Sequence, residues 1–389
     1  MVKKMKIRIN KEFIFFMTLL VPIFEPQIFT QFVSTTIIYI ILNIIEFFYL
    51  LLKANNQIPK LFFFWIFIRL YLLVICLLNN NFSGILNFGY LSLQVANLIL
   101  LFYFCYKRKK IQVLVEGIAI ISFALLFINF VTLVFFENGI IPSSYWDNHD
   151  NDIYFLGIKT KIPYYIFPAI ASSIAIKNSS KRKKWICLNL IVSIFNIFAK
   201  NVSTGIIFLL GLLVIYILRN KKKLNPCALI LIGFGIQFGI VFFKVYNLFS
   251  FIIVDILHKS MSLSSRVYIW NNAIDFFKNA NIFNQIFGHG IFKGYAYVLY
   301  DSSVWQPHSQ ILDLLASGGM IGTILMISFL CFTVSKILKN NKTLNMLLLI
   351  SVLIVILSSV ELYFTLAVCY TPFILIYYLS KEGEFKNNG

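Results

Sequence analysis

IQVLVEGIAIISFALLFINFVTLVFF, residues 111–136, carries a single charged residue, Glu116, near its start. About 20 apolar residues in a helix are enough to cross the hydrocarbon core of a bilayer. Four basic residues, KRKK at 107–110, come directly before this stretch, and the next basic residue is Lys159. The stretch therefore predicts a membrane-spanning helix with one basic end.

The same pattern recurs along the whole chain. Hydrophobic residues make up 59% of the 389 residues and charged residues only 13%, whereas a soluble domain has roughly 45–50% apolar residues. Mean hydropathy is +0.83. We therefore predict an all-α, polytopic integral membrane protein with about 12 spans and one large external loop. The predicted spans are 12–31, 33–52, 61–78, 84–106, 111–136, 162–177, 185–201, 203–218, 226–248, 309–335, 344–360 and 364–380.

The basic residues that give the net charge of +19 are concentrated in particular segments of the chain. Seven segments in every second gap between apolar runs hold 25 of the 34 lysines and arginines: 1–11, 53–60, 107–110, 177–184, 219–223, 336–342 and 381–386. Cytoplasmic loops of membrane proteins have this excess of positive charge. The distribution of charge therefore predicts the orientation of the protein in the membrane and does not indicate nucleic-acid binding. We predict a multi-pass protein of the cell membrane with both termini in the cytoplasm.

The apolar runs divide the chain into four parts. Residues 1–248 form a bundle of about nine spans, 249–308 a large extracytoplasmic loop, 309–380 the C-terminal spans and 381–389 a cytoplasmic tail. There is no GxxxxGK phosphate loop, which disfavours an ATP-driven transporter. The six cysteines contain no CxxC pair, so neither a disulfide framework nor a zinc site is predicted.

SVWQPHSQILDLLASGGMIGTIL, residues 303–325, joins the large loop to the next span. On an ideal helix five residues fall on one face about 80° wide, namely His308, Leu312, Leu315, Gly319 and Gly322. We expect His308 at the mouth of a packed helix, above glycines that let a neighbouring helix approach. Histidine can take a proton from a hydroxyl near neutral pH. The alternative is a polar residue that only marks the membrane boundary.

SLSSRVYIWNNAIDFF, residues 262–277, predicts a helix lying along the external interface. Ser264 or Ser265 can cap it, and Trp270 suits an interfacial anchor. Arg266 at its start suits a phosphate or diphosphate, which the guanidinium group can bind through two hydrogen bonds. The alternative is an interfacial arginine that extends to lipid headgroups.

IFNQIFGHGIFKGYAY, residues 282–297, follows in the same loop. Gly288 and Gly290 permit a tight turn or a close backbone approach. His289 between them is interpreted as a loop residue and not as a catalyst.

These motifs resemble the O-antigen polymerase and O-antigen ligase family. The resemblance rests on Arg266 with Trp270, then FGHG at 287–290, then HSQILDLLASGGMIG at 308–322, in this order. AKNVSTGIIFLLGLLVIYIL, residues 199–218, is similar to the family's earlier helix pair and its connecting turn. The resemblance covers 199–325.

The resemblance implies a GT-C-like membrane glycosyltransferase that uses no cofactor. It implies metal-independent, inverting transfer of a glycan from a polyprenyl diphosphate at the outer leaflet, with Arg266 and His308 catalytic. A departing diphosphate needs cationic groups to stabilise its charge. Related ligases often have a further arginine near the connecting turn, where the nearest basic residue here is Lys200. The substrate-binding residues expected are Lys200, Ser203, Trp270, Arg69, Gly288 and Gly290.

Arg69, within FWIFIRLYLL at 64–73, is an ionisable residue inside a predicted span. Such residues are costly in a bilayer and are often functional. Arg69 either faces a cavity and binds substrate or pairs with Glu46. Lys244 and Glu361, near the external ends of their spans, are expected to line the same cavity.

WDNHDND, residues 146–152, contains Asp150 and Asp152 in a DxD arrangement. Many metal-dependent glycosyltransferases use such a pair to hold a divalent ion through carboxylate oxygens. This metal site is kept as the weaker alternative to a solvated acidic loop.

The function indicated is polymerisation of lipid-linked repeat units of a surface polysaccharide, such as O-antigen, capsule or exopolysaccharide. Ligation of a finished glycan to another acceptor uses the same chemistry and stays open. A lipid-linked oligosaccharide flippase is the alternative from another class, but the polar motifs gather in one external loop, which favours an enzyme. Expected partners are the lipid-linked glycan, the bilayer, a flippase and a chain-length regulator, with no nucleic acid.

Overall fold

The computed structural model describes residues 11–54, 57–79, 84–142, 152–218, 225–251, 254–255, 260–261, 263, 266–290, 306–337 and 341–387. Over these ranges the chain is helical, and β-pairing is limited to two isolated bridges, Ile141 with Ile153 and Tyr154 with Gly157. The all-α prediction is confirmed for this part of the chain.

Five of the described helices are long and apolar enough to cross a membrane. They are α2 (Val33–Lys53), α3 (Lys60–Leu78), α4 (Ile85–Lys107), α5 (Ile111–Phe135) and α13 (Gln310–Val334). Other helices accompany them: α6 (Ile162–Ala175), α7 (Ser179–Ala199), α8 (Ser203–Leu218), α9 (Pro226–Phe242), α14 (Lys342–Leu357) and α15 (Thr371–Asn387). The helices agree with a membrane protein, and the five long ones are fewer than the twelve spans predicted.

The first and the last predicted spans are not continuous helices. The span predicted at 12–31 contains α1 (Lys11–Leu20), an irregular segment around Glu25 and Pro26, and the 3-10 helix η1 (Gln27–Gln31). Proline lacks the backbone donor that a helix interior needs, so the helix ends before this segment. The last predicted span begins later than expected, because the 3-10 turns η6 (Tyr363–Thr365) and η7 (Ala367–Tyr370) precede α15.

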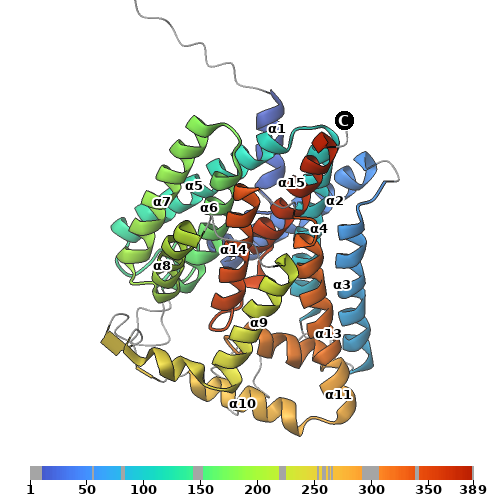
Figure 1. The fold of residues 1–389 in the computed structure, drawn as a ribbon, viewed down its shortest axis with the longest axis vertical. Coiled ribbons are helices and arrows are strands. Elements are labelled where there is room, and N and C mark those ends of the chain that lie inside the picture. The colour runs from blue at the N-terminus through green and yellow to red at the C-terminus, as the bar shows by residue number, and fades with distance from the viewer. Residues whose placement is uncertain are drawn as a thin grey trace, which may run out of the picture.

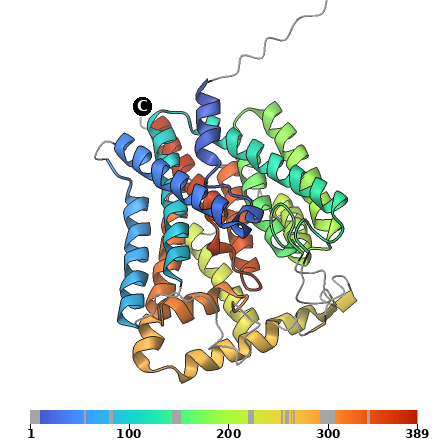
Figure 2. The same cartoon turned by 180° about the vertical axis from the view of Figure 1, so that it is seen from behind.

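The helices form a bundle with one end covered by helices that run across it (Figures 1 and 2). Helices α5 to α8 lie on one side and α3 and α4 on the other, with α9, α13 and α14 between them. Helices α10 (Arg266–Asn279) and α11 (Ile282–Phe287) lie across the lower end in Figure 1, opposite α1 and the C-terminus. The large loop thus supplies a helical layer at one end of the bundle.

Helix α10 confirms the helix predicted from Arg266 onward, but its apolar face is buried. Ile269, Trp270, Ala273 and Ile274 pack with Tyr246 and with the first turns of α13 in a small second core. The expectation that Trp270 anchors the helix in the membrane interface is wrong, because its side chain is only 1% exposed and packs edge-on against Tyr246. The predicted capping residues, Ser264 and Ser265, lie outside the described residues.

The single-face arrangement predicted for 308–322 is also wrong. Helix α13 begins at Gln310, and His308 precedes it with a left-handed backbone, φ +46°. The helix is then broken at Gly319, with φ +62° and ψ −163°. Residues on the two sides of this break do not share one continuous helical face.

The break in α13 exists because the 288–290 backbone packs directly against it. The amide of His289 donates to the carbonyl of Ala316, and the amide of Gly290 donates to that of Ser317, each at 2.9 Å. Gly288 and Gly290 have φ of +90° and +86°, which glycine adopts at little cost. The predicted close backbone approach at these two glycines is confirmed.

Tyr71 of α3 fastens this junction from the side. Its hydroxyl lies within hydrogen-bond distance of the carbonyl oxygens of Phe287, at 2.9 Å, and Gly318, at 2.8 Å, and can donate to either. A Cβ atom at Gly322 would lie 3.3 Å from the Tyr71 ring, so α3 and α13 approach closely where glycine stands. The junction therefore fixes the loop to two spanning helices.

We expect Gly319→Ala to destabilise the protein by about 1–3 kcal/mol, since alanine disfavours a positive φ. A Cβ atom there would also collide with the carbonyl of Ile286. The matched control is Gly235→Ala in α9, where a Cβ atom meets nothing within 4 Å. The measurement is the thermal unfolding of both variants in detergent, and equal melting temperatures would show that the junction is not rigid.

Candidate functional site

Arg266 and His308 converge on Glu361, in the connection between α14 and α15. Arg266 Nη2 lies 3.2 Å from Glu361 Oε2, and His308 Nδ1 lies 3.7 Å from Glu361 Oε1. The Glu361 side chain is only 2% exposed, whereas those of Arg266 and His308 are 19% and 28% exposed. One buried carboxylate thus gathers the two side chains that the sequence indicated.

Local backbone structure brings His308 to this place. The amide of Gln310 donates to the carbonyl of Ser358 at 2.8 Å, and Gln310 Oε1 accepts from the amide of Phe364 at 3.1 Å. These bonds hold the start of α13 against the segment that contains Glu361. Gln306 also lies here, with its Nε2 3.4 Å from both Glu361 Oε1 and His308 Nδ1.

The charge around Glu361 favours its ionised form. Burial alone raises the pKa of a carboxyl group, but the contact and charge of His308, with the charges of Lys161 and Arg266, outweigh it. The net effect lowers the pKa of Glu361 to about 2. Burial lowers the pKa of Lys161, and the charge of Glu361 offsets part of this lowering. Glu361 is therefore a carboxylate at any physiological pH.

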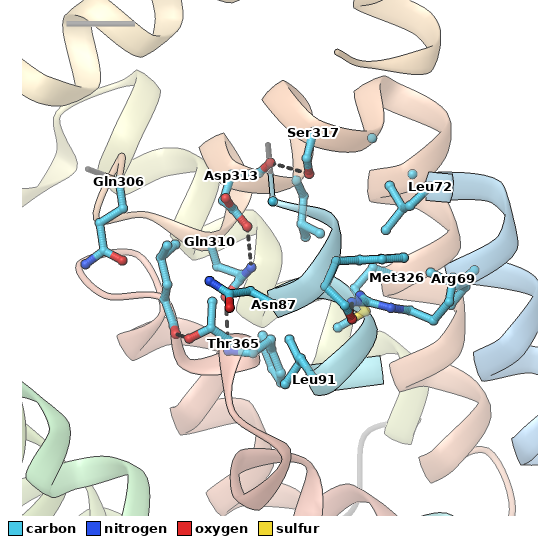
Figure 3. A pocket seen from close by; sticks show the side chains of 18 of the residues that line it. Arg69, Leu72, Asn87, Leu91, Gln306, Gln310, Asp313, Ser317, Met326 and Thr365 are labelled. Atoms are coloured by element: carbon cyan, nitrogen blue, oxygen red, sulfur yellow. Dashed lines mark hydrogen bonds between the residues drawn. The ribbon is translucent and has the colours of Figure 1, made fainter. Parts of the chain in front are cut away.

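A cavity of about 370 Å³, lined by both polar and apolar side chains, adjoins Arg266, His308 and Glu361 through Gln306. Figure 3 shows Gln306 and Gln310 at one side, Asp313 and Ser317 from α13, Asn87 in the middle and Arg69 at the opposite side. Gln310 Nε2 donates to Asp313 Oδ2 at 3.3 Å. Amide, hydroxyl and carboxylate groups with apolar neighbours such as Leu91 and Met326 are a lining that suits sugar rings.

The structure favours a cavity position for Arg69 over a pair with Glu46. Arg69 Nε donates to Ser92 Oγ at 2.7 Å, and the guanidinium group stacks on the Phe88 ring at 4.0 Å. Both carboxylate oxygens of Glu46 are buried without a hydrogen-bond partner among the described residues. Arg69 thus lines the cavity that the sequence left as one of two alternatives.

Lys200 and Ser203 stand at the turn between α7 and α8. Lys200 Nζ donates to the carbonyl of Glu137 at 3.2 Å and lies over the Tyr154 ring at 4.6 Å. In the described part of the chain no ion pair joins Lys200 to Glu361, on which Arg266 and His308 converge. Ser203 is half-buried at the first position of α8.

Among the described residues no ion pair joins the remaining predicted residues to Glu361, and neither Lys244 nor Glu361 lines the cavity that contains Arg69. Lys244 precedes the 3-10 helix η4 (Val245–Phe249) with a left-handed φ of +53°. His289 is a loop residue, as interpreted, with its Nδ1 3.2 Å from Asn284 Nδ2 and its ring against Phe276. Asp150 lies outside the described residues, while Asp152 is buried. Among the described residues no group of three His, Cys, Asp or Glu side chains is placed to hold a metal ion.

One stretch of the sequence, from within α7 to within α13, is similar to a known family. Residues 188–327 match the family model for O-antigen ligase. The match spans α8, α9, α10 and most of α13, and so includes both Arg266 and His308. It confirms the resemblance to the O-antigen polymerase and ligase family that the motifs indicated. No curated protein sequence matches the chain.

Sequence reasoning missed several residues of the site. Lys161 and Asn87 lie in no motif, and Gln306, Gln310 and Asp313 lie in the stretch 303–325 but were given no role there. Glu361, beyond the part of the chain similar to O-antigen ligase, was expected only to line a cavity. Its position in a nearly charge-free region of the sequence was the available signal.

The ionised state of Glu361 makes a testable contribution to stability. Because its pKa is lowered from 4.5 to about 2, the contribution is present above pH 4.5 and is lost as the pH falls toward 2. We expect Glu361→Gln to lose about 3 kcal/mol of stability at pH 7, and the gap from the natural protein to narrow below pH 4.5. Thermal unfolding in detergent across this pH range measures the gap.

Glu116→Gln is the matched control, since Glu116 pairs with Lys181 at an exposed site, 2.9 Å apart. Such pairs contribute little, so its effect is expected to be small at every pH. A Glu361→Gln penalty that does not change with pH would contradict the proposed charge interaction.

Proposed function

We propose that the protein is a membrane glycosyltransferase that polymerises polyprenyl-diphosphate-linked repeat units of a surface polysaccharide at the outer leaflet. The observation that carries the proposal is the meeting of Arg266 and His308 at Glu361, within and just beyond the stretch similar to O-antigen ligase. A lipid-linked donor also accounts for an active site at the end of a bundle of apolar helices.

In this proposal His308 is the general base. The acceptor hydroxyl oxygen attacks the anomeric carbon of the donor, the bond from that carbon to the diphosphate breaks, and His308 takes the hydroxyl proton. A single displacement of this kind inverts the anomeric centre, and the residues named need no metal ion. Glu361 lies beside Nδ1 of His308, so it positions the ring with Nε2 toward the acceptor.

Arg266 stabilises the departing diphosphate. One of its terminal nitrogens pairs with Glu361, but its buried Nε has no hydrogen-bond partner among the described residues. A guanidinium group fixed on one side by a carboxylate can still present its other donors to phosphate oxygens. Lys200 and Ser203, at the α7–α8 turn, are assigned to binding the carrier diphosphate on the same grounds of charge and hydrogen bonding.

The cavity beside Gln306 binds the sugars. Its polar side chains Asn87, Gln306, Gln310 and Asp313 can exchange hydrogen bonds with sugar hydroxyls. Arg69 gives its inner end a positive charge that suits an acidic sugar or a phosphate substituent. The junction of Gly288 and Gly290 with α13 supports this cavity from the external side, since Gly318 lines it.

The first prediction for this function concerns His308. We expect His308→Ala to lower the glycosyl-transfer rate about 10²–10⁴-fold, because the acceptor hydroxyl loses its base. The measurement is the size distribution of lipid-linked glycan in cells that carry either form. Single repeat units on the outer leaflet are expected to accumulate in the variant.

The control is His289→Ala, which changes a histidine of the same loop that has no catalytic role in this proposal. The glycan sizes in this variant are expected to stay near those of the natural protein. Long lipid-linked chains in the His308→Ala cells would identify a ligase, which transfers a finished glycan to another acceptor. An unchanged distribution would overturn the catalytic role and favour a flippase, whose transport needs no base.

The second prediction concerns Glu361 as a positioning residue. We expect Glu361→Gln to lower kcat at least tenfold with little change in KM for the lipid-linked donor, since the histidine is no longer oriented by charge. Glu361→Asp, which keeps the charge on a shorter side chain, is expected to recover part of kcat. The measurement is transfer by purified protein at saturating donor. Equal kcat values in both variants would contradict the role of the charge.

A further inference from the structure

An apolar groove of about 770 Å³ lies among α6, α7, α8 and α14, away from the site described above. Its α7 wall is a run of residues spaced by four, Ile186, Leu190, Ile194 and Phe198, which places them on one face of the helix. Residues of α8 form the facing wall, including Leu209, Leu210, Leu213 and Tyr216. Several of these side chains are highly exposed, with Leu213 and Phe198 both at 63%.

Arg182 stands at the basic end of this groove. It is four residues before Ile186, so it lies on the same face of α7 as the apolar wall. The side chain is half-buried, and no acidic partner for it is found among the described residues. Lys342, the first residue of α14, lines the same end of the groove.

A second, polar cavity of about 280 Å³ adjoins the groove, and the two share Arg182 and Thr343 in their linings. The polar cavity is lined by Lys177, Gln112 and Asn341 and by Glu382, which pairs with Lys177 at 2.7 Å. Asn341 caps α14 by accepting from the amide of Leu344 at 3.1 Å. The N-terminus of α14 therefore lies at this cavity, and a helix N-terminus favours a negative charge.

We propose that the groove and this cavity together bind one anionic phospholipid. One acyl chain of the lipid fills the apolar groove, and the phosphate lies between Arg182, Lys342 and the start of α14. Charge complementarity favours this occupant. Arg182 is half-buried and has no acidic partner among the described residues, so an anionic headgroup would supply the negative charge that pairs with it. The site lies in the leaflet at the basic end of the bundle, and the assignment is independent of the glycosyltransferase function.

The test is native mass spectrometry of the full-length protein purified in detergent, titrated with phosphatidylglycerol or with phosphatidylcholine of the same acyl chains. We expect phosphatidylglycerol to bind at least tenfold more tightly. In the double variant Arg182→Gln with Lys342→Gln, its Kd is expected to rise about fivefold for each cation removed. Leu213→Trp, which fills the groove, is expected to weaken both lipids.

The matched control is Lys183→Gln with Lys184→Gln, which makes the same change of charge on the same helix at two exposed residues that line neither cavity. Equal losses in the two double variants would overturn the proposal, because they would show only a general attraction of charge. Displacement of phosphatidylglycerol by a lower concentration of undecaprenyl phosphate would also overturn it, since the occupant would then be a polyprenyl carrier.

Discussion

The buried carboxylate of Glu361 is the interaction on which the arrangement of this end of the molecule depends. An unpaired charge in so enclosed a position is costly, and removing one member of such a group leaves the others uncompensated. Arg266 and Lys161 supply compensating charge and His308 contacts the carboxylate, so three separate segments of the chain meet at it. The need to neutralise one carboxylate thus draws together α10, the start of α13 and the segment before α6.

The second constraint is the contact between backbones at Gly288, Gly290 and Gly319. It divides α13 into a part that lies across the end of the bundle and a part that crosses the bundle, as Figure 1 shows. The transverse part carries Gln310, Asp313 and Ser317, which line the cavity beside the Glu361 cluster. A continuous helix would carry these residues along the bundle axis instead of across its end, so their place in the cavity depends on the break in the helix.

These two constraints act on the same small region. The carboxylate fixes where Arg266 and His308 stand, and the glycine junction fixes one wall of the cavity beside them. The apolar helices around them provide a rigid support in a bilayer. In this arrangement a helix residue, Arg266, and a loop residue, His308, more than forty positions apart in the sequence, meet at one carboxylate, as the proposed function requires.

The sequence determined the class of the protein and the residues to examine. Long apolar runs predict spanning helices because a bilayer offers no partners for free backbone groups, and the order of the Arg266, FGHG and His308 motifs indicated the family resemblance. The tertiary structure decided what periodicity could not: that α13 breaks at Gly319, that Trp270 is buried, and that Arg266 and His308 meet at Glu361. Each depends on contacts between segments distant in sequence, and an ideal-helix projection assumes that such contacts are absent.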